Sequence, residues 1–218
     1  MPDPRYLLLS LPILILSFTV HEFAHAWVAL KQGDDTAYML GRVTLNPAAH
    51  IDPVGTLLLP MIAMLTGAPL LGWAKPVPTT PRKYRNYKRG DLLVSIAGVV
   101  ANFGMAIVFT LLCVAMIWAY RLAPGAEGVW NTLLQMFDIG VRLNILLILF
   151  NLIPIPPLDG SRVLVHFLSP KAALSYREMS RYGMAVLMLL VFVGGFRFLT
   201  PLTNGIYSVF RGLQEVLV

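Results

Sequence analysis

Charged side chains are scarce in this sequence, and their scarcity limits the class of protein. Of 218 residues, 13% are charged and 57% are hydrophobic, whereas soluble domains average about 25% charged residues. A chain with so few charges cannot cover a water-facing surface in the ordinary way, which excludes a typical soluble protein. Apolar runs of about twenty residues recur instead, the length that crosses a bilayer core as a helix. We therefore expect an all-α, multi-pass integral membrane protein, folded as a helical bundle.

Cysteine is nearly absent as well. Cys113 is the only cysteine, and it stands in an apolar run. A single cysteine excludes a disulfide within the chain and a cysteine-based metal site. Internal repeats and low-complexity linkers are also lacking, so we expect one domain over residues 1–218, with a core over 6–160 and a C-terminal span and amphipathic tail over 175–218.

The net charge of +6 comes from basic residues that gather between the apolar runs. They are Arg82, Lys83, Arg85, Lys88 and Arg89 in one segment, and Lys171, Arg177 and Arg181 in another. Loops rich in Lys and Arg stay on the cytoplasmic side, near anionic lipid headgroups. This distribution favours the lipid bilayer over nucleic acid as the partner. We expect a prokaryotic cell membrane, with the functional site opening toward the cytoplasm.

Apolar length and breaks give the expected order of helices. Four full spans are predicted, over residues 6–30, 91–120, 130–152 and 179–199, with an amphipathic interfacial helix over 202–218. The first run is expected to be retained rather than cleaved as a signal peptide, because Phe23 and Trp27 crowd the only cleavage-like site. The apolar segment 51–69 contains five Pro and Gly residues, so we expect it to be re-entrant or interfacial.

The number of membrane crossings between the loops supports that interpretation of residues 51–69. A full crossing would put the basic segment 82–89 on the side opposite residues 32–50. A segment that dips in and returns keeps both on the cytoplasmic side, and it lets His25 and Asp159 approach each other from the same face. Such irregular backbone is tolerated at membrane depth where protein or a wet cavity satisfies it.

Two short stretches are expected to be extended. Residues 41–46 alternate polar and apolar side chains, which predicts a short β-strand. Residues 71–78 contain Pro76 and Pro78, and residues that precede proline avoid the helical region. These pieces could bind an opened substrate segment by strand addition, with Val43 and Thr44 as candidate contacts.

The first span carries His21-Glu22-Phe23-Ala24-His25. Histidines four residues apart lie one turn apart on the same helix face, so both imidazoles can reach one metal ion, and the adjacent Glu22 is placed as a general base. A carboxylate deep in a membrane helix costs about 2.5–3.5 kcal/mol on insertion scales, so it indicates a functional site. The alternative is a set of packed polar residues that satisfy one another.

A catalytic zinc needs a third protein ligand, and Asp159 is a candidate where proline residues break a membrane helix. There the sequence reads Asn151-Leu152-Ile153-Pro154-Ile155-Pro156-Pro157-Leu158-Asp159-Gly160. Together with the His-Glu-x-x-His helix, and with Ala97-Gly98 followed by Asn102, this stretch resembles the site-2 protease family of intramembrane zinc metalloproteases (peptidase family M50). No inserted segment is long enough for the PDZ domain found in some members.

The resemblance implies a role for each matching residue. His21, His25 and Asp159 would be the zinc ligands, Glu22 the general base, and Asn151 the side chain that holds the substrate carbonyl or the developing oxyanion. Asn151 could otherwise cap its helix. Asn102 would contact the substrate or support the site from the neighbouring helix, or it could simply hydrogen-bond between helices. The family usually has a proline directly after Ala-Gly, and Val99 stands at that position here.

Three further polar features remain open. His50 could line the mouth of the site, bind zinc in a resting state, or pair with Asp52 at the surface, and the surface pair is favoured. His166 is expected at the membrane interface. Asp138 and Arg142 lie four residues apart within a span, which predicts a salt bridge.

The sequence therefore predicts a zinc-dependent endopeptidase that cleaves transmembrane segments of membrane proteins. A metal-ion transporter or binding protein that uses the same histidine and carboxylate cluster is the alternative. A transporter would need further carboxylates along a path across the bilayer, and few are available.

Overall fold

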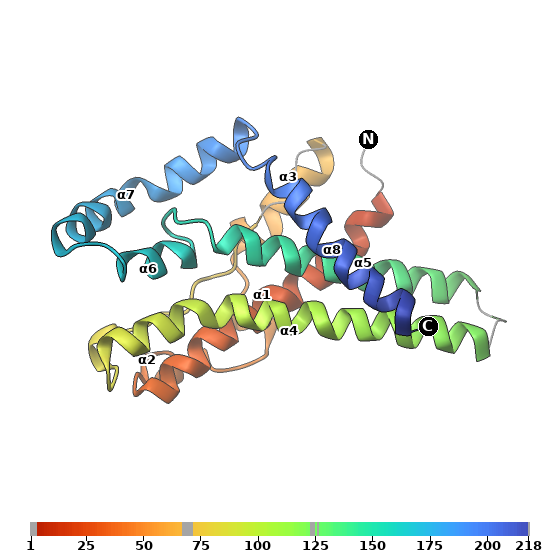
Figure 1. Ribbon diagram of the computed structural model, residues 1–218, viewed down its shortest axis with the longest axis horizontal. Coiled ribbons are helices and arrows are strands. Elements are labelled where there is room, and N and C mark those ends of the chain that lie inside the picture. The colour runs from red at the N-terminus through yellow and green to blue at the C-terminus, as the bar shows by residue number, and fades with distance from the viewer. Residues whose placement is uncertain (1–3, 67–71, 123–124, 126, 218) are drawn as a thin grey trace.

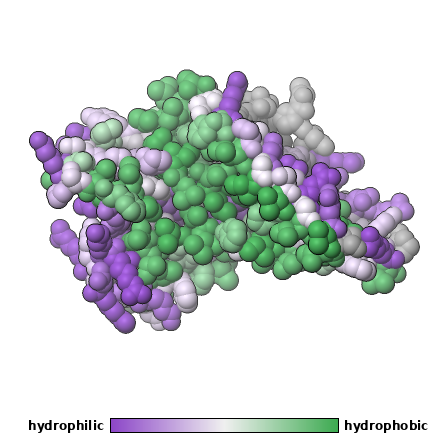
Figure 2. Space-filling view, in the orientation of Figure 1, coloured by the Kyte–Doolittle hydropathy of each residue, from purple (hydrophilic) through white to green (hydrophobic). Residues whose placement is uncertain are grey.

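The computed structural model describes residues 4–66, 72–122, 125 and 127–217. Three long apolar helices form its framework: α1 (Pro4–Gln32), α4 (Tyr87–Leu122) and α5 (Glu127–Asn151). In Figure 1, α4 and α5 run along the long axis of the molecule, and α1 crosses this axis obliquely while packing against both. Each is long and apolar enough to cross a membrane, and the middle of the visible surface is a broad hydrophobic band between hydrophilic ends (Figure 2). The chain is an all-α integral membrane protein, as predicted.

Apolar side chains at helical spacing hold the three helices together. The core includes Ile13, Leu14 and Phe18 of α1, Ala106 and Phe109 of α4, and Ile139, Leu143 and Leu147 of α5. One buried polar contact joins α1 to α5, where Asn144 Nδ2 donates to Ser17 Oγ over 2.9 Å. Hydrogen bonds between helices contribute to association in membranes, where no hydrophobic driving force exists between helices.

The segment 51–69 does not carry the chain to the other end of the bundle. It contains η2, a π-helix (Pro53–Leu58), and α3 (Leu59–Thr66), while residues 67–69 fall outside the described part. The outgoing and returning chains lie together, because Trp73 N donates to Gly55 O and Lys75 N donates to His50 O over 3.2 and 2.9 Å. The described parts of the two chains therefore run back beside each other, as a dip and return requires; the position of this segment in the membrane stays a prediction.

Residues 41–46 are not a strand, contrary to the prediction. They follow α2 (Thr36–Met39) and lead into η1 (Pro47–Ala49), and no strand occurs in the described residues. The alternation has another cause: buried Arg42 reaches Lys75 O with its Nη2 over 2.6 Å. The buried Arg42 side chain therefore produces the alternation of polar and apolar residues, although these residues pair with no strand in the described part of the chain.

The predicted fourth span, 179–199, is also corrected. The chain there forms α7 (Pro170–Phe192), which begins nine residues earlier and has a charged first half, with Lys171, Arg177, Glu178 and Arg181. Three helices, without α7, meet the length and composition of a span among the residues described. After a turn with Gly194 at φ +71°, α8 (Leu199–Leu217) packs obliquely over α4 and α5 (Figure 1).

Candidate metal centre

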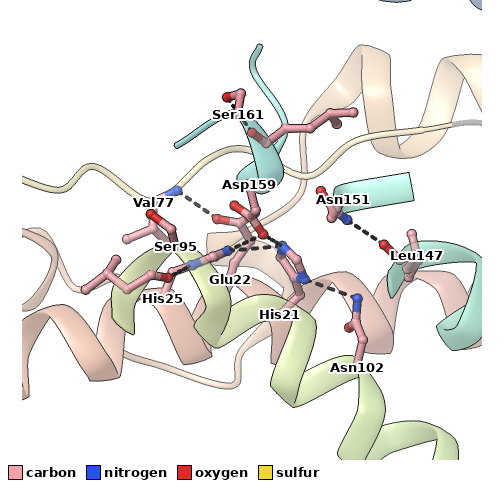
Figure 3. A network of polar contacts seen from close by, with 12 residues as sticks. His21, Glu22, His25, Val77, Ser95, Asn102, Leu147, Asn151, Asp159 and Ser161 are labelled. Carbon is pink, nitrogen blue, oxygen red and sulfur yellow. Dashed lines mark hydrogen bonds and ion pairs between the residues drawn. The ribbon is translucent and has the colours of Figure 1, made fainter. Parts of the chain in front are cut away.

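Three side chains converge between α1 and α6 (Asp159–Val165) (Figure 3). His21 and His25 project from successive turns of α1, and Asp159 is the first residue of α6. The Nε2 atoms of the two histidines lie 3.1 Å apart, and Asp159 Oδ2 lies 3.4 Å from His21 Nε2 and 3.3 Å from His25 Nε2. These three atoms form a triangle. Both histidines are more than nine-tenths buried. The predicted ligand set is therefore together in space.

This triangle has the dimensions that a zinc ion requires. Ligand atoms about 2.05 Å from a tetrahedral ion lie about 3.3 Å from one another, close to the three distances above. Asp159 Oδ2 is buried and makes no hydrogen bond, although it faces two imidazoles. Two imidazoles and one carboxylate are also the donor types of catalytic zinc sites, which keep a fourth position open. The residues present fit a zinc ion.

Contacts to the far side of each ring bear on the tautomer of the histidines. His25 Nδ1 lies 2.7 Å from the carbonyl oxygen of Val94, so this nitrogen carries the proton and Nε2 is free to bind a metal. His21 Nδ1 lies 3.1 Å from Asn102 Nδ2, while Asn102 Oδ1 is buried without a partner. The opposite orientation of the Asn102 amide would give Oδ1 a donor and free Nε2 of His21 in the same way.

Two glycines allow the close approach of these elements. A Cβ atom on Gly98 would lie 2.3–2.5 Å from ring atoms of His21 and His25, so only glycine lets α4 pass behind the imidazoles. A Cβ atom on Gly160 would lie 2.3 Å from Leu152 O, so glycine also lets α6 begin against the end of α5. The glycines in Ala97-Gly98 and Leu158-Asp159-Gly160 therefore have a steric role.

A buried ionic network anchors α6. Asp91 of α4 accepts hydrogen bonds from Arg162 Nη2 over 2.8 Å and from His166 Nε2 over 2.9 Å. Burial raises the pKa of the Asp159 carboxyl, but His21 and His25 lower it by more and hold it well below its usual range. The network fixes the helix that carries Asp159, and it places His166 against Asp91. The expected position of His166 at the membrane interface stays a prediction.

Glu22 faces a pocket of about 190 Å³ next to the triangle. Its Oε2 accepts a hydrogen bond from Val77 N over 2.8 Å, so the segment 72–80, which has no helix or strand, crosses the site. Trp73, Ala74, Pro76 and Thr79 of this segment also line the pocket. Residues 72–78 of the predicted extended stretch are therefore non-helical and contact the site; residue 71 lies outside the described part.

The remaining predicted site residues divide into two groups. Asn151 lines the pocket from the end of α5, and its Nδ2 donates to Leu147 O over 2.9 Å. Asn102, His50, Val43 and Thr44 do not belong to the described lining.

The predicted surface pair of His50 and Asp52 is wrong. His50 is 1% exposed and its Nε2 contacts Thr44 O over 2.9 Å, while Asp52 caps η2 by accepting from Val54 N and Gly55 N. The neighbouring positions suggested a pair, but the π-turn engages the carboxylate with its own backbone.

Sequence reasoning missed Asp91, Arg162 and the backbone of Val77. Arg162 follows Asp159 by three residues, one helical turn, and Asp91 opens the predicted helix 91–120 as an isolated acid. An acid and a base at the ends of apolar helices could have suggested a pair. No sequence signal could have shown that a peptide N–H would bind Glu22.

Comparisons with known proteins agree with this geometry. Residues 9–193 match the model of peptidase family M50. The candidate zinc metalloprotease YwhC of Bacillus subtilis is 42% identical over 192 residues, which cover 87% of this chain and 79% of that protein. No solved structure gives a significant match.

Two candidate zinc metalloproteases called Rip2 are also similar. They are 28% identical in Mycolicibacterium smegmatis and 29% identical in Mycobacterium tuberculosis, over 81% and 88% of this chain. The chain spans 64% and 66% of the length of these mycobacterial proteins. A family model that matches most of the chain, with a relative 42% identical over 87% of it, assigns the family: the chain belongs to peptidase family M50.

Proposed function

We propose that this protein is a zinc-dependent intramembrane endopeptidase that cleaves membrane-spanning segments of other proteins. One observation carries the proposal. His21 Nε2, His25 Nε2 and Asp159 Oδ2 form a triangle of 3.1–3.4 Å beside Glu22, and both histidines and Glu22 belong to a helix long enough to cross a membrane. Zinc-dependent peptide hydrolysis at membrane depth needs this combination of metal ligands, a base and a membrane helix.

The roles of the ligands and the base follow from their positions. His21, His25 and Asp159 would hold zinc, which when bound acts as a Lewis acid toward the peptide carbonyl and lowers the pKa of a coordinated water. Glu22 accepts the proton of the attacking water. Because Val77 N–H engages Oε2 of Glu22, the carboxylate is held in place and Oε1 is left for the proton.

Asn151 and the segment 72–80 position the substrate. One N–H of the Asn151 amide bonds to Leu147 O, and the other can donate to the substrate carbonyl as negative charge develops on it. A helical substrate hides its peptide groups, so it must unwind before attack. The segment 72–80 lines the pocket and offers backbone groups to an unwound strand, a role predicted for residues 41–46 as well.

The basic residues support an orientation with the site toward the cytoplasm of a cell membrane. Arg85 N donates to Gln32 O over 2.8 Å, and Arg177 Nη2 donates to the Tyr87 hydroxyl over 3.1 Å. Both basic segments therefore lie at the same end of the bundle as the end of α1. The residues described contain one group of three potential metal ligands, so nothing favours a transport path.

The test is cleavage of a membrane-spanning model substrate in proteoliposomes. Glu22→Gln should lose cleavage, because the amide cannot accept the proton. Glu178→Gln removes an exposed carboxylate of α7 and serves as the matched control, with cleavage equal to wild type. Full cleavage by Glu22→Gln would refute the mechanism, and zinc flux into liposomes that survives Glu22→Gln would favour the transporter.

A further inference from the structure

A second cavity adjoins the site pocket. It has a volume of about 330 Å³, against about 190 Å³ for the pocket that holds Glu22. Both cavities are lined by Phe18, Gly72, Leu147 and Phe150. These shared walls place the second cavity directly beside the pocket in which a scissile bond would lie.

The walls of the cavity come from three helical regions within the bundle. Leu14 and Phe18 belong to α1, and Leu143, Leu146 and Phe150 to α5. The turn between α7 and α8 closes the far side, where Phe196 packs edge to face on Phe150 at a ring distance of 5.4 Å. The cavity therefore lies between the middle of α1 and the C-terminal third of α5, both of which are candidate spans.

The chemistry of the walls restricts what can enter. Arg197 and Thr200, at the α8 end, are the polar side chains of the described lining, and the other side chains are apolar. A polar side chain placed between α1 and α5 would find no hydrogen-bond partner among the described side chains there, so its desolvation would not be offset. The volume exceeds that of any one side chain, so a large apolar side chain fits without displacing the walls.

We propose that this cavity is a specificity subsite that receives a bulky apolar side chain, of leucine or phenylalanine type, from the unwound substrate next to the scissile bond. The inference rests on the proposed protease function. Lipid is as apolar as the cavity, so burial itself gives little driving force. Selection comes from packing, which is lost when a small side chain leaves the cavity partly empty, and from exclusion of polar side chains.

Leu146 is the position from which to test this subsite. It lines the second cavity and does not line the pocket that holds Glu22. Leu146→Trp narrows the cavity and Leu146→Ala enlarges it. Leu111→Trp adds the same side chain on the exposed face of α4, where Leu111 is 54% exposed, and is the matched control.

The experiment compares a series of membrane-spanning substrates that carry Ala, Leu or Trp in turn at each of the residues flanking the cut. At one of these positions, wild type and Leu111→Trp should cleave the Leu substrate about tenfold faster than the Ala substrate, as expected for a difference of a few methylenes. Leu146→Trp should abolish this preference, and Leu146→Ala should extend it to the Trp substrate. Zinc content should be equal in all variants.

The outcomes separate the subsite from the enzyme. Unchanged substrate ratios in both Leu146 variants, with wild-type cleavage intact, would overturn the subsite alone. Absence of any preference in wild type would do the same. A wild-type protein that binds zinc and cuts no member of the series would overturn the proposed function.

Discussion

Asn102 is the residue through which α4 acts on the metal-facing nitrogen of His21. It is fully buried, and its amide is 3.1 Å from His21 Nδ1. If Oδ1 accepts the Nδ1 proton, Asn102→Asp keeps an acceptor and should retain zinc. Asn102→Leu removes the acceptor and should weaken zinc binding about 10- to 100-fold, as for other residues that orient metal ligands. Competition with a chelator measures the affinity.

The outcome also decides between the two roles of Asn102 that the sequence left open. Equal zinc affinity in the Leu variant, combined with a raised KM, would assign Asn102 to substrate binding instead. Equal losses in the Asp and Leu variants would contradict the acceptor role, because the acceptor would then make no difference.

Individual site residues could be predicted where the information is local. The four-residue spacing of His21 and His25 places both on one helix face whatever the tertiary structure. The prolines before Asp159 predict the break in the helix. His50 could not be placed, because its side chain contacts the backbone of Thr44 and its carbonyl oxygen accepts from Lys75 N of the returning chain. The pairing of Asp91 with Arg162 joins positions 71 residues apart, which no local pattern encodes.

At the scale of elements, α6 depends on Asp91 for its position. Asp91→Ala leaves the Arg162 guanidinium without its partner, and breaking a largely buried pair costs about 3 kcal/mol or more. We expect a lower thermal midpoint and a lower zinc content, because α6 carries Asp159. Asp91→Asn should be milder, since it keeps one acceptor oxygen.

An exposed ion pair provides the control for Asp91. Lys83 Nζ lies 2.6 Å from Asp35 Oδ1, and both side chains are about half exposed. Asp35→Ala should therefore change the thermal midpoint and the zinc content little. Zinc content and a thermal midpoint in Asp91→Ala equal to those of Asp35→Ala would show that α6 is held by other contacts.

The helices α1, α4 and α5 were predicted to within a few residues, because the length of an apolar run is a property of the chain itself. The end of α7 at Phe192 was not predicted, since the span was expected to continue to residue 199. Its apolar residues continue toward Phe196, but the turn at Gly194 takes a positive φ that an unbroken helix excludes. The strand expected over 41–46 failed for a different reason, since strand pairing requires a partner segment that sequence alternation does not supply.

At the scale of the whole molecule, both basic segments lie at the same end of the bundle, and the proposed orientation puts them on the cytoplasmic side of the membrane. In a Cys113→Ser background, cysteines at Arg85 and Ala172 should both react with a membrane-impermeant maleimide from the cytoplasmic side. A cysteine at Glu127, beyond one passage of α4, should react from the opposite side. Labelling of Arg85 and Ala172 positions from different sides would contradict the orientation proposed here.

The position of both basic segments at one end of the bundle was predictable, because it follows from the number of long apolar helices between them. The route of the chain between α3 and α4 was not predictable. Val77 reaches Glu22 through a peptide N–H, and backbone contacts of this kind leave no trace in side-chain patterns.

The zinc content of purified protein tests the central claim most directly. Metal analysis should find about one zinc ion per chain in wild type and in Glu22→Gln, since a base that does not bind the ion is not needed to retain it. Asp159→Ala, which leaves only His21 and His25, should lose the zinc, because two ligands hold the ion poorly. Full zinc content in Asp159→Ala, or zinc lost from Glu22→Gln as completely as from Asp159→Ala, would contradict the assignment of ligands and base.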